Sequence, residues 1–332
     1  MLAGETMGTT WAVTLRAPDL SRSSHAAWRA IVQEELDRVN AAMSTWDPDS
    51  ELSRFNAHVS MAPFSLSAAT LSVMELSKEV GAASGGAFDV TVRPLVAAFG
   101  FGAGARVPGE LPSEAELEEI RARVGADRLL LDPAAGQARK LHPLLEVELS
   151  AVAKGYGVEQ VARRLIAEGQ ADFLVEVGGE IDARGQRPGG GPWRLAVERP
   201  EPDGRAVHAV VELSGLAMAT SGDYRSFYEA GGEKLSHLLD PRIGRPIQHA
   251  LASVSVVHVS AAAADAWATA LFVLGPEDGP ALAEERGIGA YFILRTDEDR
   301  YETRVTPGFP AILTPDGTPG EAPGPAGAGG KG

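Results

Sequence analysis

Residues 261–274 read A-A-A-A-D-A-W-A-T-A-L-F-V-L. The run is rich in Ala and Leu and carries one charged side chain, so it predicts a helix buried among other elements. Asp265 and Thr269 are four residues apart and project from one face of that helix. An unpaired buried carboxylate is costly, so Asp265 needs a partner. The two oxygens suit a hard cation such as Mg²⁺; alternatively, Asp265 pairs locally and Thr269 only fills space.

A second informative stretch lies shortly before this helix. Residues 234–246 read K-L-S-H-L-L-D-P-R-I-G-R-P. The first proline and the glycine predict a tight loop, since Pro locks φ and Gly accepts positive φ at little cost. Such a loop can hold the imidazole of His237, the carboxylate of Asp240 and the guanidinium of Arg242 at constant spacing, as a catalytic site requires. A rigid surface turn would need similar residues, and Asp240 and Arg242 could simply pair with each other.

The third segment spans residues 147–165 and reads V-E-L-S-A-V-A-K-G-Y-G-V-E-Q-V-A-R-R-L. It predicts a strand that ends near Leu149, a turn of small residues and an amphipathic helix from about Gly155. Backbone groups exposed at such a turn can bind phosphate or, through a carbonyl, a metal. Lys154 lies at this junction, where its charge could meet a pyrophosphate. The spacing of a Walker loop is missing, and small-residue turns before helices are also common packing devices.

The rest of the chain predicts alternating helices and strands. Helices are expected at residues 24–44, 67–83 and 278–286. A short acidic helix is also expected to begin at Ser113, with a capping box of Ser113 and Glu116. Strands are expected at residues 6–17, over much of 128–198 and 206–239, and at 253–259, where alternation with Val predicts a half-buried strand. This order predicts an α+β fold of mixed, mostly antiparallel sheets with flanking helices. The candidate residues come from distant loops, so they should converge in a cleft between two lobes.

Composition limits the classes of function. The chain has 332 residues, 44% of them hydrophobic and 23% charged, as in soluble globular proteins. Its formal net charge of −15 argues against nucleic-acid binding, which needs clustered Lys and Arg. The absence of cysteine excludes disulfides, zinc–thiolate sites and thiol nucleophiles. Residues 1–313 are expected to form one domain, and the Pro- and Gly-rich residues 314–332 to be a disordered tail.

The sequence as written also bears on location. No run of about 20 apolar residues is present, so direct membrane insertion is not expected. The N-terminus has neither a charged n-region nor an apolar h-region, which predicts a cytoplasmic protein, or an exported one if a signal has been trimmed.

Together with five further segments, these stretches resemble one family, the FAD:protein FMN transferases of the ApbE type. The further segments are M-G-T-T at 7–10, M-S-T-W-D-P-D-S-E-L-S-R-F-N at 43–56, G-G-A-F-D-V-T-V-R-P-L at 85–95, V-G-G-E-I at 177–181 and A-T-S-G-D-Y-R at 219–225. Each short match is unspecific, but they occur in the family's order and cover nearly the whole chain.

The resemblance implies roles for individual residues. FAD would be contacted by Met7, Trp46, Ala87, Phe88, Asp89, Glu148 and Lys154. Mg²⁺ would be held by the carbonyl of Ala151 together with Asp265 and Thr269. His237 would take the proton from the acceptor hydroxyl. Apart from the resemblance, Asp240 and Arg242 are further candidates, one to orient His237 and the other to contact phosphate. Where Glu148 stands, the family often has Asp, which is one methylene shorter.

Simpler interpretations exist for several of these residues. Met7, at the start of a strand, could belong to the core. Trp46 could pack against the end of the preceding helix. Asp89 could cap the end of a strand or pair with Arg93.

The resemblance implies Mg²⁺-dependent transfer of FMN from FAD to a threonine hydroxyl of an acceptor flavoprotein through a phosphoester bond, with release of AMP. The acceptor would carry a motif of the form Asp-x-x-(Ser/Thr)-Gly-Ala-Thr. Two alternatives stay open: a Mg²⁺-dependent FAD pyrophosphatase that gives FMN and AMP, and a non-catalytic FAD-binding protein. The retained His237, Asp265 and Thr269 disfavour the last, because storage needs neither a base nor a metal.

Overall fold

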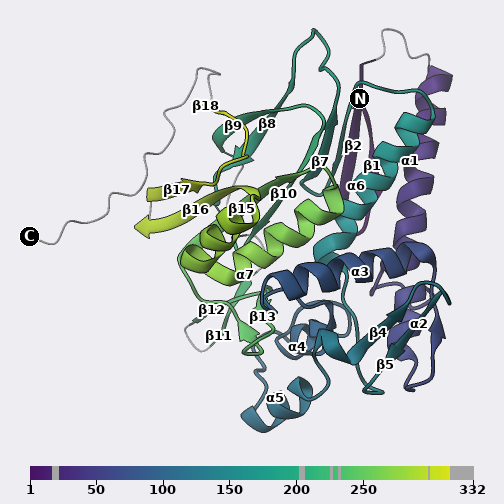
Figure 1. Cartoon of the computed structure of the whole chain (residues 1–332), viewed down its shortest axis with the longest axis vertical. Helices are drawn as coiled ribbons and strands as arrows, with labels where there is room; N and C mark the ends of the chain where they lie inside the picture. The colour runs from purple at the N-terminus through teal and green to yellow at the C-terminus, as the bar shows by residue number, and fades with distance from the viewer. Residues whose placement is uncertain (17–21, 202–205, 225–226, 231–232, 298–299, 315–332) are drawn as a thin grey trace, which may run out of the picture.

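A large antiparallel sheet forms the centre of the protein (Figure 1). The structure is a computed structural model, which describes residues 1–16, 22–201, 206–224, 227–230, 233–297 and 300–314. The eight strands of the sheet lie in the order β1-β2-β6-β7-β10-β15-β16-β17. Their bounds are Leu2–Thr6, Thr9–Leu15, Phe173–Val177, Glu180–Arg184, Leu216–Gly222, Leu251–His258, Gly289–Asp297 and Arg300–Val305. Every strand pair within the described ranges is antiparallel. The predicted α+β fold with mostly antiparallel sheets is confirmed.

Three long helices cover one face of this sheet (Figure 1): α1 (Arg22–Met43), α6 (Ser150–Ala167) and α7 (Ala261–Arg286). The Ala-rich stretch predicted to be a buried helix is the first part of α7, and its small side chains let the helix pack closely on β15 and β16. Gly275, at φ 85°, interrupts α7 and separates it from the helix predicted at 278–286. Both predicted helices are therefore confirmed.

The opposite face of the large sheet is covered by a three-stranded sheet in the order β18-β9-β8, with bounds Ile312–Leu313, Val207–Leu213 and Trp193–Glu198. Trp193, Leu195 and Val211 pack there on side chains of the large sheet. Strand β15 is consequently buried along seven of its eight residues. The prediction of a half-buried strand at 253–259 is wrong, because covering layers lie on both faces of the sheet. The hydroxyl of Ser255 is bonded inside to that of Thr220 at 2.7 Å.

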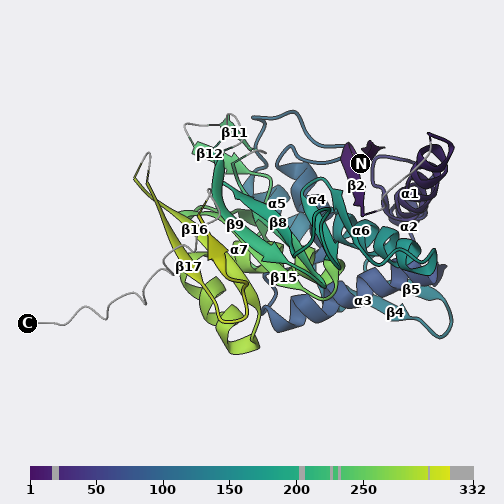
Figure 2. The ribbon, with the colours of Figure 1, turned by 90° about the horizontal axis from the view of Figure 1, so that it is seen from above.

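A further layer packs outside α6 and α7. It contains α2 (Glu51–Ala57), α3 (Ala68–Ala83) and a small sheet of β3 (Phe64–Ser65), β5 (Gln137–Lys140) and β4 (Leu129–Asp132). Figure 2 shows β4 and β5 beside α3, away from the three-stranded sheet. No helix within the described ranges is long and apolar enough to cross a membrane.

Short elements connect this layer to the large sheet. They are η1 (Val90–Val92), α4 (Arg93–Ala98), α5 (Glu114–Arg121), η2 (Ala126–Arg128), β11 (Phe227–Ala230), β12 (Glu233–Ser236), β13 (Leu239–Asp240) and β14 (Arg245–Pro246). The predicted capping box at the start of α5 is confirmed. Residues 315–332, predicted to be a disordered tail, lie outside the described residues.

Two boundaries differ from the predictions. The strand expected at 6–17 is a hairpin of β1 and β2, turned by Met7 (φ 49°) and Gly8 (φ 71°), because two successive positive φ values make a tight turn. No strand ends at Leu149, and α6 begins at Ser150, five residues before the expected start. The small residues that predicted a turn before Gly155 instead form the first turn of α6, and Gly155 is a position of close packing inside that helix. A Cβ atom on Gly155 would lie 2.3 Å from the carbonyl oxygen of Ala261.

Candidate active site

Three adjoining cavities lie where α6 and α7 meet the loops that follow α1, α3 and β12. The central cavity, of about 220 Å³, is lined by Ser150 and Ala151 of α6, Thr269 of α7 and the loop residue His237, among others. A second cavity of about 480 Å³, named here the Met7 cavity, shares Trp46, Glu148 and Ser150 with it. A third of about 560 Å³, the Arg242 cavity, shares Phe88, Asp89 and Pro241. The three cavities therefore adjoin along shared walls, and together they are called the depression.

The structure brings most of the candidate residues to this depression. The central cavity receives Trp46, Ala87, Phe88, Asp89, Glu148, Ala151, His237 and Thr269. Met7 and Lys154 line the Met7 cavity, and Arg242 lines the Arg242 cavity. Asp240 and Asp265 are buried behind the walls.

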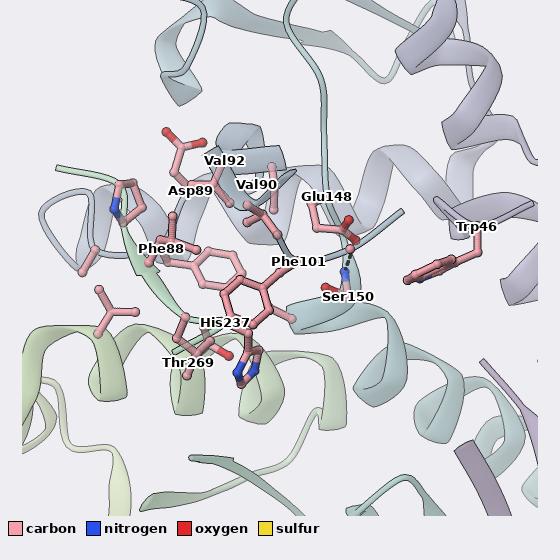
Figure 3. A pocket seen from close by; sticks show the side chains of 18 residues that line it. Trp46, Phe88, Asp89, Val90, Val92, Phe101, Glu148, Ser150, His237 and Thr269 are labelled. Atoms are coloured by element: carbon pink, nitrogen blue, oxygen red, sulfur yellow. Dashed lines mark hydrogen bonds between the residues drawn. The ribbon is translucent and has the colours of Figure 1, made fainter. Parts of the chain in front are cut away.

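His237 lies in the loop between β12 and β13 and reaches the central cavity (Figure 3). Its ring stands edge-on to that of Phe101, with 6.3 Å between the ring centroids. Figure 3 shows His237 beside Thr269, so an imidazole and a hydroxyl face the same part of the cavity. An imidazole in this position can accept a proton from a ligand bound there.

Asp240 and Arg242 pair with each other. Arg242 donates from Nε and Nη2 to the carboxylate of Asp240, at 2.9 and 2.7 Å. Hydrogen bonding and the charge of Asp240 raise the pKa of Arg242 above its ordinary value. This bidentate pair closes the turn, and it directs Arg242 to the Arg242 cavity rather than to the central one.

Helix α5 supports the same loop from outside. Arg121 donates a hydrogen bond from Nη2 to the carbonyl of Ile243 at 2.6 Å, and Glu114 forms an ion pair with Arg245. Leu239 packs in the small apolar cluster formed by α4 and α5. The position of His237 therefore depends on an element more than 100 residues earlier in the chain.

The opposite wall is built by α6 and α7. Asp265 is 3% exposed, and its Oδ2 accepts a hydrogen bond from the backbone N–H of Gly155 at 2.9 Å. Its Oδ1 lies 3.8 Å from Nζ of Lys154. The hydroxyl of Thr269 is 2.9 Å from that of Ser221 on β10. The predicted placement of Asp265 and Thr269 on one face of a buried helix agrees with these contacts.

Burial and charge act together on the ionisable groups of this wall. Burial raises the pKa of Asp265, which the charge of Lys154 opposes. Burial also raises the pKa of Glu180, the other carboxylate beside Lys154, and the charge of Lys154 again opposes the rise. Burial alone would lower the pKa of Lys154, but the two carboxylates outweigh it and raise the pKa. Lys154 therefore stays protonated at neutral pH.

The oxygen atoms of this wall fit a hard cation. Asp265 offers a carboxylate, Thr269 a hydroxyl and Ala151 a backbone carbonyl at the start of α6, and oxygen is the ligand that Mg²⁺ prefers. Within the described ranges no group of three or more His, Cys, Asp or Glu residues could hold a metal. Because Mg²⁺ prefers six ligands, an ion held by Asp265, Thr269 and Ala151 would keep coordination positions for water or a phosphate ligand.

Met7 and Trp46 lie at the other end of the depression. Met7 packs on α1 and α6 but also lines the Met7 cavity, so its side chain serves the core and a cavity together. Trp46 is 75% exposed and lies between the central and Met7 cavities. Its exposure does not agree with the alternative in which it packs against a helix end. A flat aromatic ring on a cavity wall can stack on a planar ligand.

Asp89 and Glu148 are both held by hydrogen bonds. Asp89 caps η1 by accepting from the N–H of Thr91 at 2.8 Å, and its other oxygen accepts from the N–H of Ala126. It is thus a cap of a 3-10 helix rather than of a strand. Burial raises its pKa and these hydrogen bonds oppose the rise.

The alternative that Asp89 pairs with Arg93 is wrong, because Arg93 lies 3.0 Å from Glu146 and donates to the carbonyl of Ala103. Glu148 accepts from the N–H of Ser150 and from Thr45, both at 3.1 Å. The Ser150 bond is visible in Figure 3.

Several residues of the site were not predicted. Glu180 and Ser221, the partners of Lys154 and Thr269, lie in two segments that were recognised without a role for these side chains. Phe101 lies in a loop without periodicity, and no pattern marks it. Only the pairing of the strands in the sheet shows that Glu180 faces Lys154 and Ser221 faces Thr269, and the sequence alone does not give that pairing.

This fold and depression define the protein class of the ApbE flavin transferases. The structure is similar to the flavin transferase ApbE from Vibrio cholerae, with a TM-score of 0.83, 39% identity and coverage of 93% of this chain and 97% of that one. It is also similar to the apo form of the Pseudomonas stutzeri flavinyl transferase ApbE, with a TM-score of 0.82, 36% identity and coverage of 92% and 93%.

The chain itself belongs to the ApbE family, whose model matches residues 7–292. Two curated relatives carry the name FAD:protein FMN transferase. The Vibrio cholerae protein is 42% identical over 318 residues, which cover 94% of this chain and 92% of that protein. The Escherichia coli K12 protein is 38% identical over 315 residues, covering 94% and 89%. The predicted family membership is confirmed.

Proposed function

We propose that the protein is an FAD:protein FMN transferase, which moves FMN from FAD to a threonine hydroxyl of an acceptor flavoprotein and releases AMP. Family membership and the names of the relatives support flavin transfer. The observation that carries the rest is the central cavity, which His237, Ala151 and Thr269 line together. A base and a cation site in one cavity suit attack on a phosphate bound there.

FAD is proposed to lie along the depression. Its flavin would contact Met7 and Trp46, and the segment from Ala87 to Asp89 and Glu148 would contact the dinucleotide further along. Lys154 provides a positive charge on the wall of the Met7 cavity, with 30% of its side chain exposed. Two carboxylates lie beside Lys154, so a bound divalent cation would be needed to make this wall net positive for an anionic ligand.

The reaction requires one proton transfer and one exchange of phosphoester partners. His237 accepts the proton as the threonine oxygen bonds to the FMN phosphorus. The bond from that phosphorus to the bridging oxygen breaks, and AMP leaves with the bridging oxygen. When bound by Ala151, Asp265 and Thr269, Mg²⁺ would stabilise the charge that develops on the departing phosphate. Positioning should dominate, as in other phosphoryl transfers.

The acceptor is proposed to carry its threonine in a motif of the form Asp-x-x-(Ser/Thr)-Gly-Ala-Thr. Asp240 and Arg242 are proposed to position His237 and phosphate without touching the reacting atoms. Their ion pair fixes the turn that follows His237, and Arg242 could meet phosphate from the Arg242 cavity.

Mass spectrometry of a reaction with FAD, Mg²⁺ and a carrier that bears this motif tests the proposal. A carrier heavier by one FMN phosphoester, with AMP released and both products abolished by EDTA, is the expected result. An unmodified carrier with free FMN and AMP would indicate a pyrophosphatase. Intact bound FAD would indicate a binding protein.

A further inference from the structure

A buried cluster of three charges joins α6, α7 and β7 beside the proposed cation site. It consists of Lys154, Asp265 and Glu180, the first residue of β7. Glu180 and Asp265 are each only 3% exposed. Two carboxylates and one ammonium give the cluster a formal charge of −1. Burial of a second carboxylate is costly, so the presence of Glu180 calls for an explanation.

Lys154 does not lie evenly between the two carboxylates. Its Nζ is 2.9 Å from Oε1 of Glu180 and donates a hydrogen bond to it, whereas Oδ1 of Asp265 is 3.8 Å away. The other oxygen of Glu180, Oε2, is buried and has no hydrogen-bond partner. One carboxylate oxygen of Glu180 therefore accepts a hydrogen bond from Lys154, and the other is left without a hydrogen bond.

The turn before Glu180 is shaped to receive the lysine. Gly178 and Gly179 both have positive φ, 59° and 103°, in the turn between β6 and β7. A Cβ atom on Gly178 would lie 3.3 Å from Cδ of Lys154 and 2.9 Å from Cγ2 of Thr9. The absence of a side chain there lets the lysine stem lie against the turn, with its ammonium directed to the carboxylate that follows. This explains why the segment V-G-G-E-I combines two glycines with an acid.

The arrangement matters for a cation at Asp265. If Asp265 were the only anion near Lys154, the ammonium would move onto its Oδ1, and a divalent cation would have to displace it from a buried ion pair. A second carboxylate at hydrogen-bonding distance removes that competition, because the ammonium is already paired elsewhere. With Mg²⁺ added, the formal charge of the cluster changes from −1 to +1, which suits an anionic substrate.

We propose that Glu180 is a positioning residue that holds the ammonium of Lys154 on the β7 side and so keeps Asp265 available to Mg²⁺. This inference rests on the proposed function, in which Asp265 is a metal ligand. It concerns metal affinity, so it can be tested without the transfer reaction.

The test is the affinity of the full chain for Mn²⁺, measured without FAD by electron paramagnetic resonance. Glu180→Gln keeps the shape of the side chain and removes its charge. We expect this variant to bind Mn²⁺ about 10- to 100-fold more weakly, the usual loss when an outer-shell partner is removed. The matched control is Glu176→Gln, because Glu176 lies on β6 just before the glycine turn and accepts from the N–H of Gly179 in that turn. It should bind Mn²⁺ as the parent does.

A double variant distinguishes loss of the positioning of Lys154 from a general distortion of the metal site. In Glu180→Gln with Lys154→Met the competing ammonium is gone, so affinity should return to within about threefold of the parent. Thermal unfolding establishes that each variant is folded. Parental affinity in Glu180→Gln, or a double variant as weak as the single one, would overturn the inference.

Asp265→Asn shows whether a negative result concerns only the role of Glu180 or the proposed metal site as a whole. If it abolishes Mn²⁺ binding while Glu180→Gln binds normally, only the role of Glu180 is wrong. If Asp265→Asn binds as well as the parent, or if the parent binds no Mn²⁺, both the metal site and the role of Glu180 are wrong.

Discussion

The two walls of the central cavity are built in different ways. The helical wall, with Ala151, Asp265 and Thr269, is part of two long packed helices that approach so closely that Gly155 has no room for a side chain. The loop wall, from His237 to Pro246, contains two strands of two residues each and is held by ion pairs and by α5.

The proposed function gives the two walls different tasks, which would account for this difference. Metal ligands must keep fixed angles and distances, which backbone packing and backbone hydrogen bonds provide. A general base must meet a hydroxyl brought by another protein, and a loop at the surface can reach it. The helical wall should therefore respond to changes in packing, whereas the loop wall should respond to the loss of a few polar contacts.

The largest effect is expected on the loop wall itself. His237→Ala should lower the rate of FMN transfer by about 10²- to 10⁴-fold, the usual contribution of a general base. FAD affinity, measured by flavin fluorescence, and the unfolding midpoint should stay at their parental values, because the loop is held by Asp240, Arg242 and α5. Transfer at the parental rate would remove His237 from the mechanism.

On the helical wall, Asp265→Ala should abolish the Mg²⁺ dependence of transfer. Loss of a charge-stabilising metal costs several kcal/mol in the transition state, so a fall of about 10²-fold or more is expected. Rates measured against Mg²⁺ concentration, with EDTA as the reference, check this. Metal-stimulated transfer in the variant would exclude Asp265 as a ligand.

Gly155→Ala tests the close packing of the helical wall. The added Cβ would lie 2.3 Å from the carbonyl oxygen of Ala261 and 2.8 Å from Cβ of Asp265, so the helices must separate. Overpacking of this kind costs about 1–3 kcal/mol of unfolding free energy, measurable by urea denaturation. Gly157→Ala is the matched control, since its Cβ would meet only the movable ends of Leu36 and Met7, at 3.3 Å. Equal losses in both variants would contradict the assigned role of the helix contact.

The smallest effect is expected at α5. Arg121→Ala removes the hydrogen bond to the carbonyl of Ile243, and a net hydrogen bond from a charged group contributes about 1.5–3 kcal/mol at most. We expect a fall in kcat of about tenfold or less with little change in the KM for FAD, and partial recovery in Arg121→Lys. Arg139→Ala, an exposed arginine on β5, is the control. A change in KM alone would indicate that Arg121 binds substrate and does not position the loop.

Local patterns predicted one wall better than the other. Spacing alone placed Asp265 and Thr269 on one face of a buried helix, because helical periodicity fixes which residues share a face. Proline and glycine predicted the tight turn after His237. The same kind of signal failed before Gly155, where small residues predicted a turn and instead form the first turn of α6, since small residues occur both in turns and at close helix contacts.

Tertiary contacts account for what was missed. Glu180 reaches Lys154 only because β7 lies beside α6, and Ser221 reaches Thr269 only because β10 lies under α7. The support of the His237 loop by Arg121 joins residues 122 positions apart. No periodicity in the chain encodes such distant pairs.

Diffraction from crystals soaked with FAD and Mn²⁺ would test the central claim most directly, because the anomalous signal of manganese marks the metal. The account predicts a manganese peak at the carboxylate of Asp265, the hydroxyl of Thr269 and the carbonyl of Ala151, with the FAD phosphates between that peak and His237. A peak elsewhere, or phosphates outside the central cavity, would contradict it.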